Sequence, residues 1–169
     1  IEEIMQKGLR MIGQGMHGFV GNNDVEFEDL DKELSHPTDL RIFAIAQALE
    51  KGYTPERIEE LTKIDLFFIN KLKNIVDYTK VLAQYNKIEE LPVDVLKEAK
   101  RLGFSDFQIA RYVENPQDTM EKGLLAVRAY RKKNGVVPTV RRINTVASEH
   151  PELTNYLYMT YGKDEHSIS

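Results

Sequence analysis

The sequence contains no cysteine among its 169 residues, which excludes disulfides, thiol nucleophiles and thiolate metal ligands. It also lacks any apolar run approaching the roughly 18 residues of a transmembrane helix, and it lacks a secretory signal. Excess positive charge is missing too, because the formal net charge is −4, which argues against a general nucleic-acid binder. The remaining composition, 41% hydrophobic and 30% charged, is typical of a globular domain with a real core.

A short motif typical of helix boundaries occurs twice, as Gly-Tyr-Thr at 52–54 and Gly-Phe-Ser at 103–105. In each copy the glycine predicts the left-handed residue that ends one helix, and the hydroxyl residue predicts the N-cap of the next helix. Pro55 follows the first copy at the first helical position, where its fixed φ is favourable. The chain therefore holds two helix–turn–helix units, which occur both in helical scaffolds and in DNA-binding proteins.

Apolar residues spaced three and four apart predict a mostly helical chain. Thr38 or Asp39 is the expected N-cap of the helix that begins at residue 40, and Asp65 is the expected cap of a longer helix. That longer helix carries its apolar stripe at Phe68, Ile69, Leu72, Ile75, Val76, Thr79 and either Leu82 or Ala83. We expect helices over residues 1–11, 40–51, 54–63, 66 to 82 or 83, 92 or 93 to 102, 105–113 and about 117–133. We also expect a helical turn or two within 26–35, and extended segments over 136–143 and 155–161. The predicted fold is all-α, an irregular orthogonal bundle of about six to eight helices with an extended C-terminal segment.

No motif predicts an active site. Residues 13–18 fit G-x-G-x-x-G, but a dinucleotide site needs that pattern between a strand and a helix, and here a helix precedes it, which favours a plain glycine loop. Adjacent acidic pairs do not share a helix face, so they do not form an acid/base pair. The histidines lack metal-ligand spacing and stand at His17, His36, His150 and His166. We predict no catalytic, cofactor-binding or metal-binding residue.

A basic cluster is the best electrostatic argument for a nucleic-acid partner. It comprises Arg128, Arg131, Lys132, Lys133, Arg141 and Arg142, with Tyr130 among them. Four of these charges also suit a helix C-terminus, where cations meet the negative end of the helix dipole, and acidic neighbours can neutralise them. A helix–turn–helix DNA binder needs a basic recognition helix, and neither 54–63 nor 105–113 is basic. A scaffold is therefore favoured, and a helix–turn–helix nucleic-acid-binding domain is the alternative.

Three ordered motifs carry a resemblance to a known family: R-I-F-A-I-A at 41–46, E-L-T-x-I-D-x-x-F at 60–68 and G-F-S-D-x-Q-I-A at 103–110. Over about residues 34–161 the succession closely resembles the oligomerisation domain of the carbamoyl phosphate synthetase large subunit. Gly8 stands where the family usually has alanine. Asn144 replaces an aspartate, and His150 replaces an aromatic residue.

The resemblance implies a division of the chain. Residues 1–23 are the tail of the first ATP-grasp synthetase half, 24–143 are the helical oligomerisation domain, and 144–169 are an extended connector toward the second half. It implies a cytoplasmic enzyme that makes carbamoyl phosphate from bicarbonate, glutamine-derived ammonia and two ATP, with ATP and Mg²⁺ held by other domains. The implied partners are both synthetase halves, other large subunits and a glutaminase, with no nucleic acid and no membrane. Arginine and pyrimidine synthesis both stay open as pathways.

In that enzyme this segment carries no catalytic residue and serves as a spacer and self-association module, because the two halves exchange a labile carbamate that must be protected from water. Such a spacer exposes apolar surface where the synthetase halves attach. We expect that surface at Tyr156, Leu157, Tyr158, Met159 and Tyr161.

Overall fold

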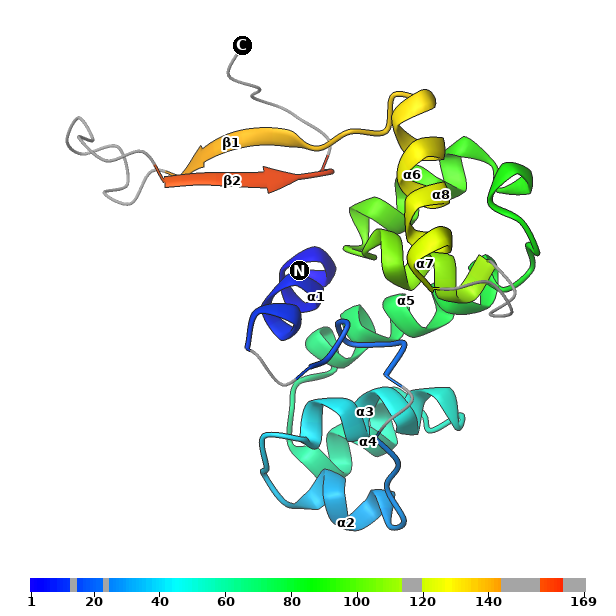
Figure 1. Ribbon diagram of the computed structural model, residues 1–169. Coiled ribbons are helices and arrows are strands. Elements are labelled where there is room, and N and C mark those ends of the chain that lie inside the picture. The colour runs from blue at the N-terminus through cyan, green and yellow to red at the C-terminus, as the bar shows by residue number, and fades with distance from the viewer. Residues whose placement is uncertain (13–14, 23–24, 114–119, 144–155, 163–169) are drawn as a thin grey trace, which may run out of the picture.

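The computed structural model describes residues 1–12, 15–22, 25–113, 120–143 and 156–162 (Figure 1). These residues form eight α-helices, one 3-10 turn and one two-stranded sheet, which confirms the predicted mostly-α fold. The elements are α1 (Glu2–Met11), α2 (Leu30–Ser35), α3 (Arg41–Glu50), α4 (Pro55–Thr62), α5 (Leu66–Leu82), η1 (Ile88–Glu90), α6 (Val93–Arg101), α7 (Asp106–Val113), α8 (Met120–Lys133), β1 (Thr139–Ile143) and β2 (Tyr156–Thr160). The predicted start of the last helix at Gln117 lies outside the described residues, as do Asn144 and His150.

The two predicted glycine turns, Gly52 between α3 and α4 and Gly103 between α6 and α7, are confirmed, and we call them the glycine corners. Gly52 and Gly103 have φ values of 90° and 87°, the left-handed conformation that glycine adopts without a Cβ penalty. At each corner the amide of the aromatic residue that follows donates to the carbonyl four residues before the glycine, at 2.9 Å and 3.0 Å. This is the Schellman arrangement, and a third copy ends α8 at Gly135, with φ 69°.

Side-chain caps begin the helices that follow the two corners. The Thr54 hydroxyl accepts from the backbone amide of Arg57 at 3.2 Å. Ser105 and Gln108 form a reciprocal capping box, because each side-chain oxygen accepts from the other residue's backbone amide, at 3.1 Å and 3.0 Å. The predicted Asp65 cap is also confirmed, since its carboxylate accepts from the second amide of α5.

Two local predictions are wrong. The N-cap of α3 is Leu40, whose side chain makes no capping bond, because the chain closes a turn from the Thr38 carbonyl to the Arg41 amide before the helix begins. Phe68 lies on the predicted apolar stripe, yet it is 51% exposed. The next residue, Ile69, is fully buried, so the covered face of α5 begins at Ile69 and leaves Phe68 outside it. A periodic pattern marks the apolar face of a helix, but the neighbouring elements decide how wide a part of that face is covered.

The long helix α5 lies between two groups of helices (Figure 1). One group, α2 to α4, packs on α5 through α3 and α4, while α7 contacts α5 from the other group and packs along α8. The N-terminal helix α1 contacts both α5 and α6. Buried aliphatic and aromatic side chains from all of these helices form one continuous core, and each buried side chain of this size stabilises the fold by roughly 1.5–3 kcal/mol.

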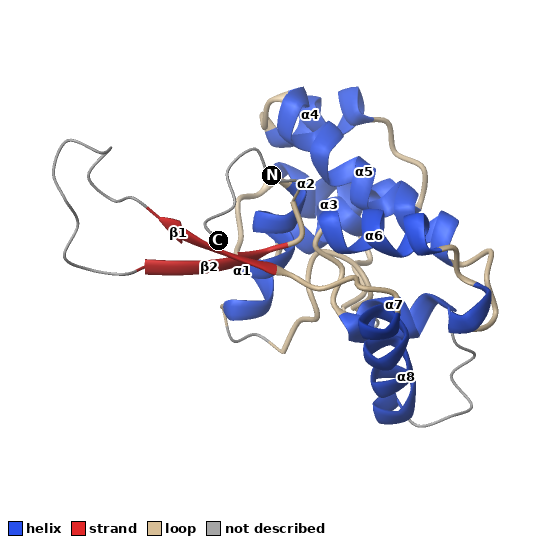
Figure 2. Ribbon diagram, turned by 90° about the horizontal axis from the view of Figure 1, so that it is seen from above, coloured by secondary structure: helices blue, strands red, loops and turns tan. Residues whose placement is uncertain are grey.

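Strands β1 and β2 form an antiparallel ribbon that runs beside α1 and extends away from the helical body (Figure 2). Val140 pairs with Met159, and these two side chains are exposed together with Leu157. The prediction of exposed apolar residues is therefore confirmed at Leu157 and Met159. It is wrong at Tyr158 and Tyr161, which are half-buried because lysine side chains cover their rings. The side chain of Tyr156 lies outside the described part.

Within the described residues, no helix has both the length and the apolar character needed to cross a membrane.

Candidate functional site

The described part of the G-x-G-x-x-G segment holds α1 against α7. Helix α1, rather than a strand, precedes the segment, which is the wrong context for a dinucleotide site. Gly18 has a φ of 138°, and a Cβ at this position would overlap the side-chain amides of Gln6 and Gln108. Gly18 therefore permits a close approach within the protein, and the glycine-loop interpretation is favoured over a phosphate loop. Gly13 and Gln14 lie outside the described residues.

Two fully buried glutamines connect the start of the chain to α7. Gln6 Oε1 accepts from the backbone amide of Phe19 at 2.9 Å and from Gln108 Nε2 at 3.0 Å. Gln108 Nε2 also donates to the carbonyl of Val20 at 2.9 Å. Gln6 Nε2 is buried without a hydrogen-bond partner, so the placement of α1 and the following loop on the helical body rests on the Gln6 oxygen and the Gln108 amide nitrogen.

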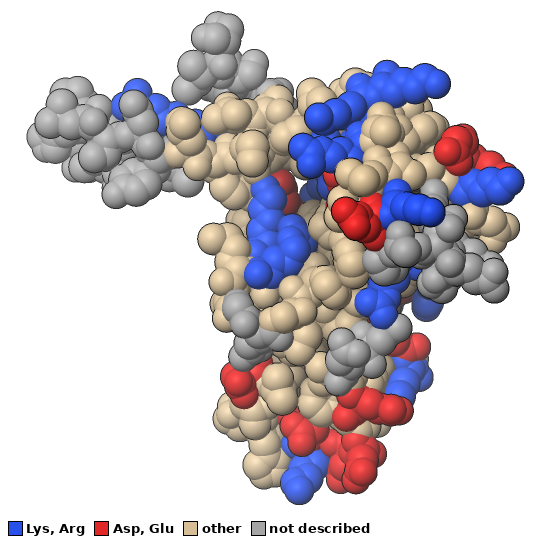
Figure 3. Space-filling view, viewed as in Figure 1, with Lys and Arg blue, Asp and Glu red and all other residues tan. Residues whose placement is uncertain are grey.

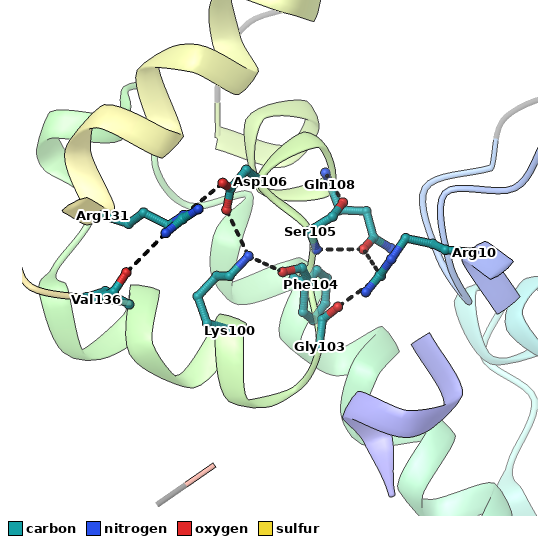
Figure 4. Close-up of polar contacts among 9 residues, drawn as sticks. All are labelled: Arg10, Lys100, Gly103, Phe104, Ser105, Asp106, Gln108, Arg131 and Val136. Carbon is teal, nitrogen blue, oxygen red and sulfur yellow. Dashed lines mark hydrogen bonds and ion pairs between the residues drawn. The ribbon is translucent and has the colours of Figure 1, made fainter. Parts of the chain in front are cut away.

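Arg10 extends this junction to the corner between α6 and α7 (Figure 4). Its Nη1 donates to the Gly103 carbonyl at 3.0 Å and to Gln108 Oε1 at 3.3 Å. Burial lowers the pKa of the Arg10 guanidinium, and the nearby Glu3 carboxylate opposes that shift. Arg10 therefore fixes this backbone turn to α1 through one nitrogen of its guanidinium group.

A buried ion triad joins α6, α7 and α8 next to the same corner (Figure 4). Asp106 accepts from Lys100 and from Arg131, each at 2.8 Å, and all three side chains are at most 13% exposed. Lys100 also donates to the Phe104 carbonyl at 2.7 Å. Such triads contribute specific geometry more than net stability, because burial of charge offsets most of the attraction.

The pKa shifts of the triad arise because one carboxylate, that of Asp106, pairs with two cations. Burial by itself raises the pKa of Asp106, but Lys100 and Arg131 outweigh burial and hold that pKa below its usual value. Burial lowers the pKa of Lys100, and the positive charges of Arg131 and Arg10 act in the same direction, against the attraction of Asp106. All three charged groups are therefore engaged within the triad, an arrangement typical of a structural network rather than of a reactive acid or base.

Sequence reasoning missed both networks. Gln6 and Gln108 are 102 residues apart, and Arg131 is 25 residues from Asp106. A capping box was readable locally, because Ser105 is followed three residues later by Gln108. The same glutamine's contact with α1 has no local signal.

The basic cluster splits in the structure. Arg131 is used within the triad, while Lys132 and Lys133 are exposed at the end of α8. Arg141 and Arg142 belong to β1. Figure 3 shows Lys and Arg side chains gathered over the end of the molecule where α8 terminates, and Asp and Glu side chains gathered over the opposite end near α2. Neutralisation by an acidic neighbour, expected for this cluster, is confirmed at Arg131.

The helix–turn–helix alternative finds no support. Helix α7 would be a recognition helix, but it buries Gln108, Ile109, Ala110 and Val113, and it packs along α8. A recognition helix must present its side chains to a DNA groove. Helix α4 begins with Pro55 and Glu56 and carries acidic residues, which phosphates repel.

The histidines within the described part have structural contacts. His17 stacks on Phe107 with ring centroids 4.0 Å apart, and His36 Nδ1 lies 2.9 Å from the Lys32 carbonyl. His150 and His166 lie outside the described residues. Among the residues that the structure describes, no group of three or more histidine, aspartate or glutamate side chains is placed to hold a metal ion.

Comparison with known proteins identifies the family. Residues 1–135 match the model of the carbamoyl-phosphate synthetase large chain, oligomerisation domain. Multifunctional protein URA2 of Saccharomyces cerevisiae is 43% identical over 99% of the chain. Arginine-specific large chains of carbamoyl phosphate synthase are 45% identical over 95% of the chain in Eremothecium gossypii and, for a mitochondrial form, 44% identical over 99% in Neurospora crassa. The chain spans only 7% of the first relative and 14% of the other two. The chain thus belongs to the family of oligomerisation domains of carbamoyl-phosphate synthetase large chains.

Proposed function

We propose that this chain is the non-catalytic interdomain and self-association module of a carbamoyl-phosphate synthase large chain. The whole enzyme would be a ligase that makes carbamoyl phosphate from bicarbonate, glutamine-derived ammonia and two ATP. Other domains would bind ATP and Mg²⁺. Relatives that carry this segment include arginine-specific large chains and multifunctional proteins, so the proposal covers both arginine and pyrimidine synthesis.

The observation that carries this proposal is the distribution of apolar surface. The helical body buries most of its large apolar side chains in one core, although Phe67, Phe68 and Leu125 are exposed. Helix α1 exposes Ile4 and Met11, and Ile12 directly after it is exposed too, all at one end of the chain. The ribbon exposes Val140 and Met159 at the other end. Exposed apolar residues grouped in this way are typical of protein interfaces. The two groups support attachment of a synthetase half at each end, with residues 1–23, 24–143 and 144–169 as tail, module and connector.

The charged networks agree with a positional role. Lys100 and Arg131 are both directed at Asp106, and Arg10 is directed at the Gly103 carbonyl and the Gln108 side chain. A module of this kind would set the separation of two synthetase halves that pass carbamate between them. The proposed partners are those halves, other large chains and a glutaminase, in the cytoplasm or in the mitochondrion that one relative's name specifies.

A fragment-versus-enzyme comparison tests the proposal. The 169-residue chain should hydrolyse no ATP above background and make no carbamoyl phosphate, while the full-length enzyme that contains it should do both. Activity in the isolated chain would overturn the non-catalytic assignment. Ile4→Glu in the full-length enzyme should impair synthesis, because a charge would be buried against the first half. Glu60→Gln on exposed α4 is the matched control and should leave synthesis unchanged.

Self-association is tested separately by light scattering over a concentration series. The full-length enzyme should show a mass that rises with concentration, and a strict monomer at high concentration would overturn the self-association part while leaving the spacer role standing.

A further inference from the structure

Two side chains of α1 bind the ribbon directly, although the segments lie more than 150 residues apart in the chain. Glu3 Oε2 accepts from the Thr160 hydroxyl at 2.6 Å, and Glu3 Oε1 lies 3.4 Å from the backbone amide of Tyr161. One helical turn along, Lys7 donates to the carbonyl of Met159 and lies 4.3 Å from the ring centroid of Tyr158. We call these contacts of Glu3 and Lys7 with β2 the α1–β2 clamp.

The clamp is shielded and internally paired. Lys7 Nζ and Glu3 Oε1 form an ion pair at 2.8 Å, so each holds the other in position. The side chain of Glu3 is 13% exposed, and Thr160 is 4% exposed. Charge-assisted hydrogen bonds are strongest in such partly buried settings, where water competes weakly. The clamp is therefore placed to fix the angle between α1 and the ribbon.

The clamp reaches beyond the segment that the family model covers. The family match ends at residue 135, and β1 and β2 follow it. Figure 2 shows the ribbon running beside α1, and the polar contacts come from the α1 surface that faces it. Under the proposed function, α1 leads out of the first synthetase half and the ribbon leads toward the second. The clamp then joins the two attachment points directly, in addition to the path through the helical core.

We propose that Glu3 and Lys7 are positioning residues that couple the two synthetase halves, an inference that rests on the proposed function. With the clamp intact, the halves keep the fixed separation that carbamate transfer requires. With the clamp lost, the ribbon turns on α1 and water reaches the transfer path. Carbamate then reacts with water to give bicarbonate and ammonia, so ATP already consumed yields no product.

The experiment uses the full-length enzyme with Glu3→Ala, Lys7→Ala and Thr160→Val. Hydrogen exchange followed by mass spectrometry reports the amides of β2, and we expect them to exchange about tenfold or more faster in each variant, with α3 to α5 unchanged. The ratio of ATP consumed to carbamoyl phosphate formed reports coupling, and we expect that ratio to rise at least about twofold while ATP hydrolysis continues. Glu60→Ala, which removes an exposed pair with Arg57 at 2.7 Å, is the matched control.

The outcomes separate the two proposals. The Thr160 hydroxyl donates to Glu3 and also accepts from the Gly162 amide at 3.0 Å, so Glu3→Ala combined with Thr160→Val should raise the ratio by less than the two single changes added together. Glu3→Gln, which keeps the acceptor for Thr160, should restore part of the coupling. Faster β2 exchange with an unchanged ATP ratio would overturn the coupling role, and unchanged β2 exchange would overturn the clamp itself. Absence of carbamoyl phosphate synthesis in the unaltered enzyme would instead overturn the proposed function.

Discussion

Replacing Gly52 or Gly103 by alanine separates the cost of a left-handed corner from the cost of contact between that corner and the rest of the molecule. The two corners have the same backbone conformation, with φ values of 90° and 87°. Their surroundings differ. An added Cβ at Gly52 meets nothing within 4 Å, whereas one at Gly103 lies 2.7 Å from the Glu3 Cα and 3.0 Å from the Gln6 Cβ.

The magnitudes follow from these distances. Alanine in the left-handed region costs about 1–2 kcal/mol, and that term applies equally to both sites. At Gly103 the backbone of α1 must also shift, and such overpacking adds about 1–3 kcal/mol. We therefore expect Gly52→Ala to destabilise the chain by about 1–2 kcal/mol and Gly103→Ala by about 2–5 kcal/mol. The difference corresponds to roughly 2–12 °C in melting temperature for a chain of this size.

Urea unfolding of the two variants measures the difference, and Gly135→Ala, also without contact within 4 Å, serves as a second control. Hydrogen exchange of α1 should quicken in Gly103→Ala alone, because the displaced helix loses the bond from Arg10 to the Gly103 carbonyl. If Gly52→Ala and Gly103→Ala lower the free energy of unfolding by the same amount, within about 0.5 kcal/mol, then the close contact between the second corner and α1 does not add the expected cost, and the reasoning is refuted.

Two further predictions concern titrating groups. Asp106→Asn should cost about 3–5 kcal/mol at pH 7, because Lys100 and Arg131 lose their shared counter-charge. Since the pKa of Asp106 lies below its usual value, the extra stability of the unaltered chain is present above about pH 4 and is lost as pH falls through the folded-state pKa. The urea midpoints of the chain and the variant should therefore converge toward pH 3, and a constant gap would contradict this. Tyr78→Phe should cost about 1 kcal/mol near pH 8 through the lost hydrogen bond to the Val95 carbonyl. Burial raises the pKa of Tyr78 to about 12, so the stabilisation by the phenol is complete below about pH 10 and is lost as pH rises through 12. The difference in unfolding free energy between the chain and the variant should therefore be smaller at about pH 11.5 than at about pH 8.

Local features of the fold were predictable because they depend on residues near each other in the chain. Glycine in a left-handed corner, the hydroxyl caps at Thr54 and Ser105, and the cap at Asp65 involve bonds that span two to five residues. The stripe of α5 was readable for the same reason and failed at Phe68, where burial depends on coverage from elsewhere.

The family resemblance was equally available from the sequence, because ordered motifs survive as residue order alone. Family membership, however, does not state which residues hold the ends of the chain together. Tyr158 and Tyr161 illustrate the limit, since their alternation with aliphatic residues predicts a strand but cannot show that Lys7 and Lys100 cover their rings.

The two glycine corners show which features the local sequence determines and which only the tertiary structure determines. The residues at 52–54 and 103–105 dictate the same turn, because φ and ψ preferences and capping bonds act within a few residues. Only the packing of α1 makes Gly103 a contact point and leaves Gly52 open to solvent, since that contact joins segments about 100 residues apart. The bonds between Gln6 and Gln108 and between Glu3 and Thr160 have the same origin. Their partners are brought within reach when the core forms, and no local preference specifies them.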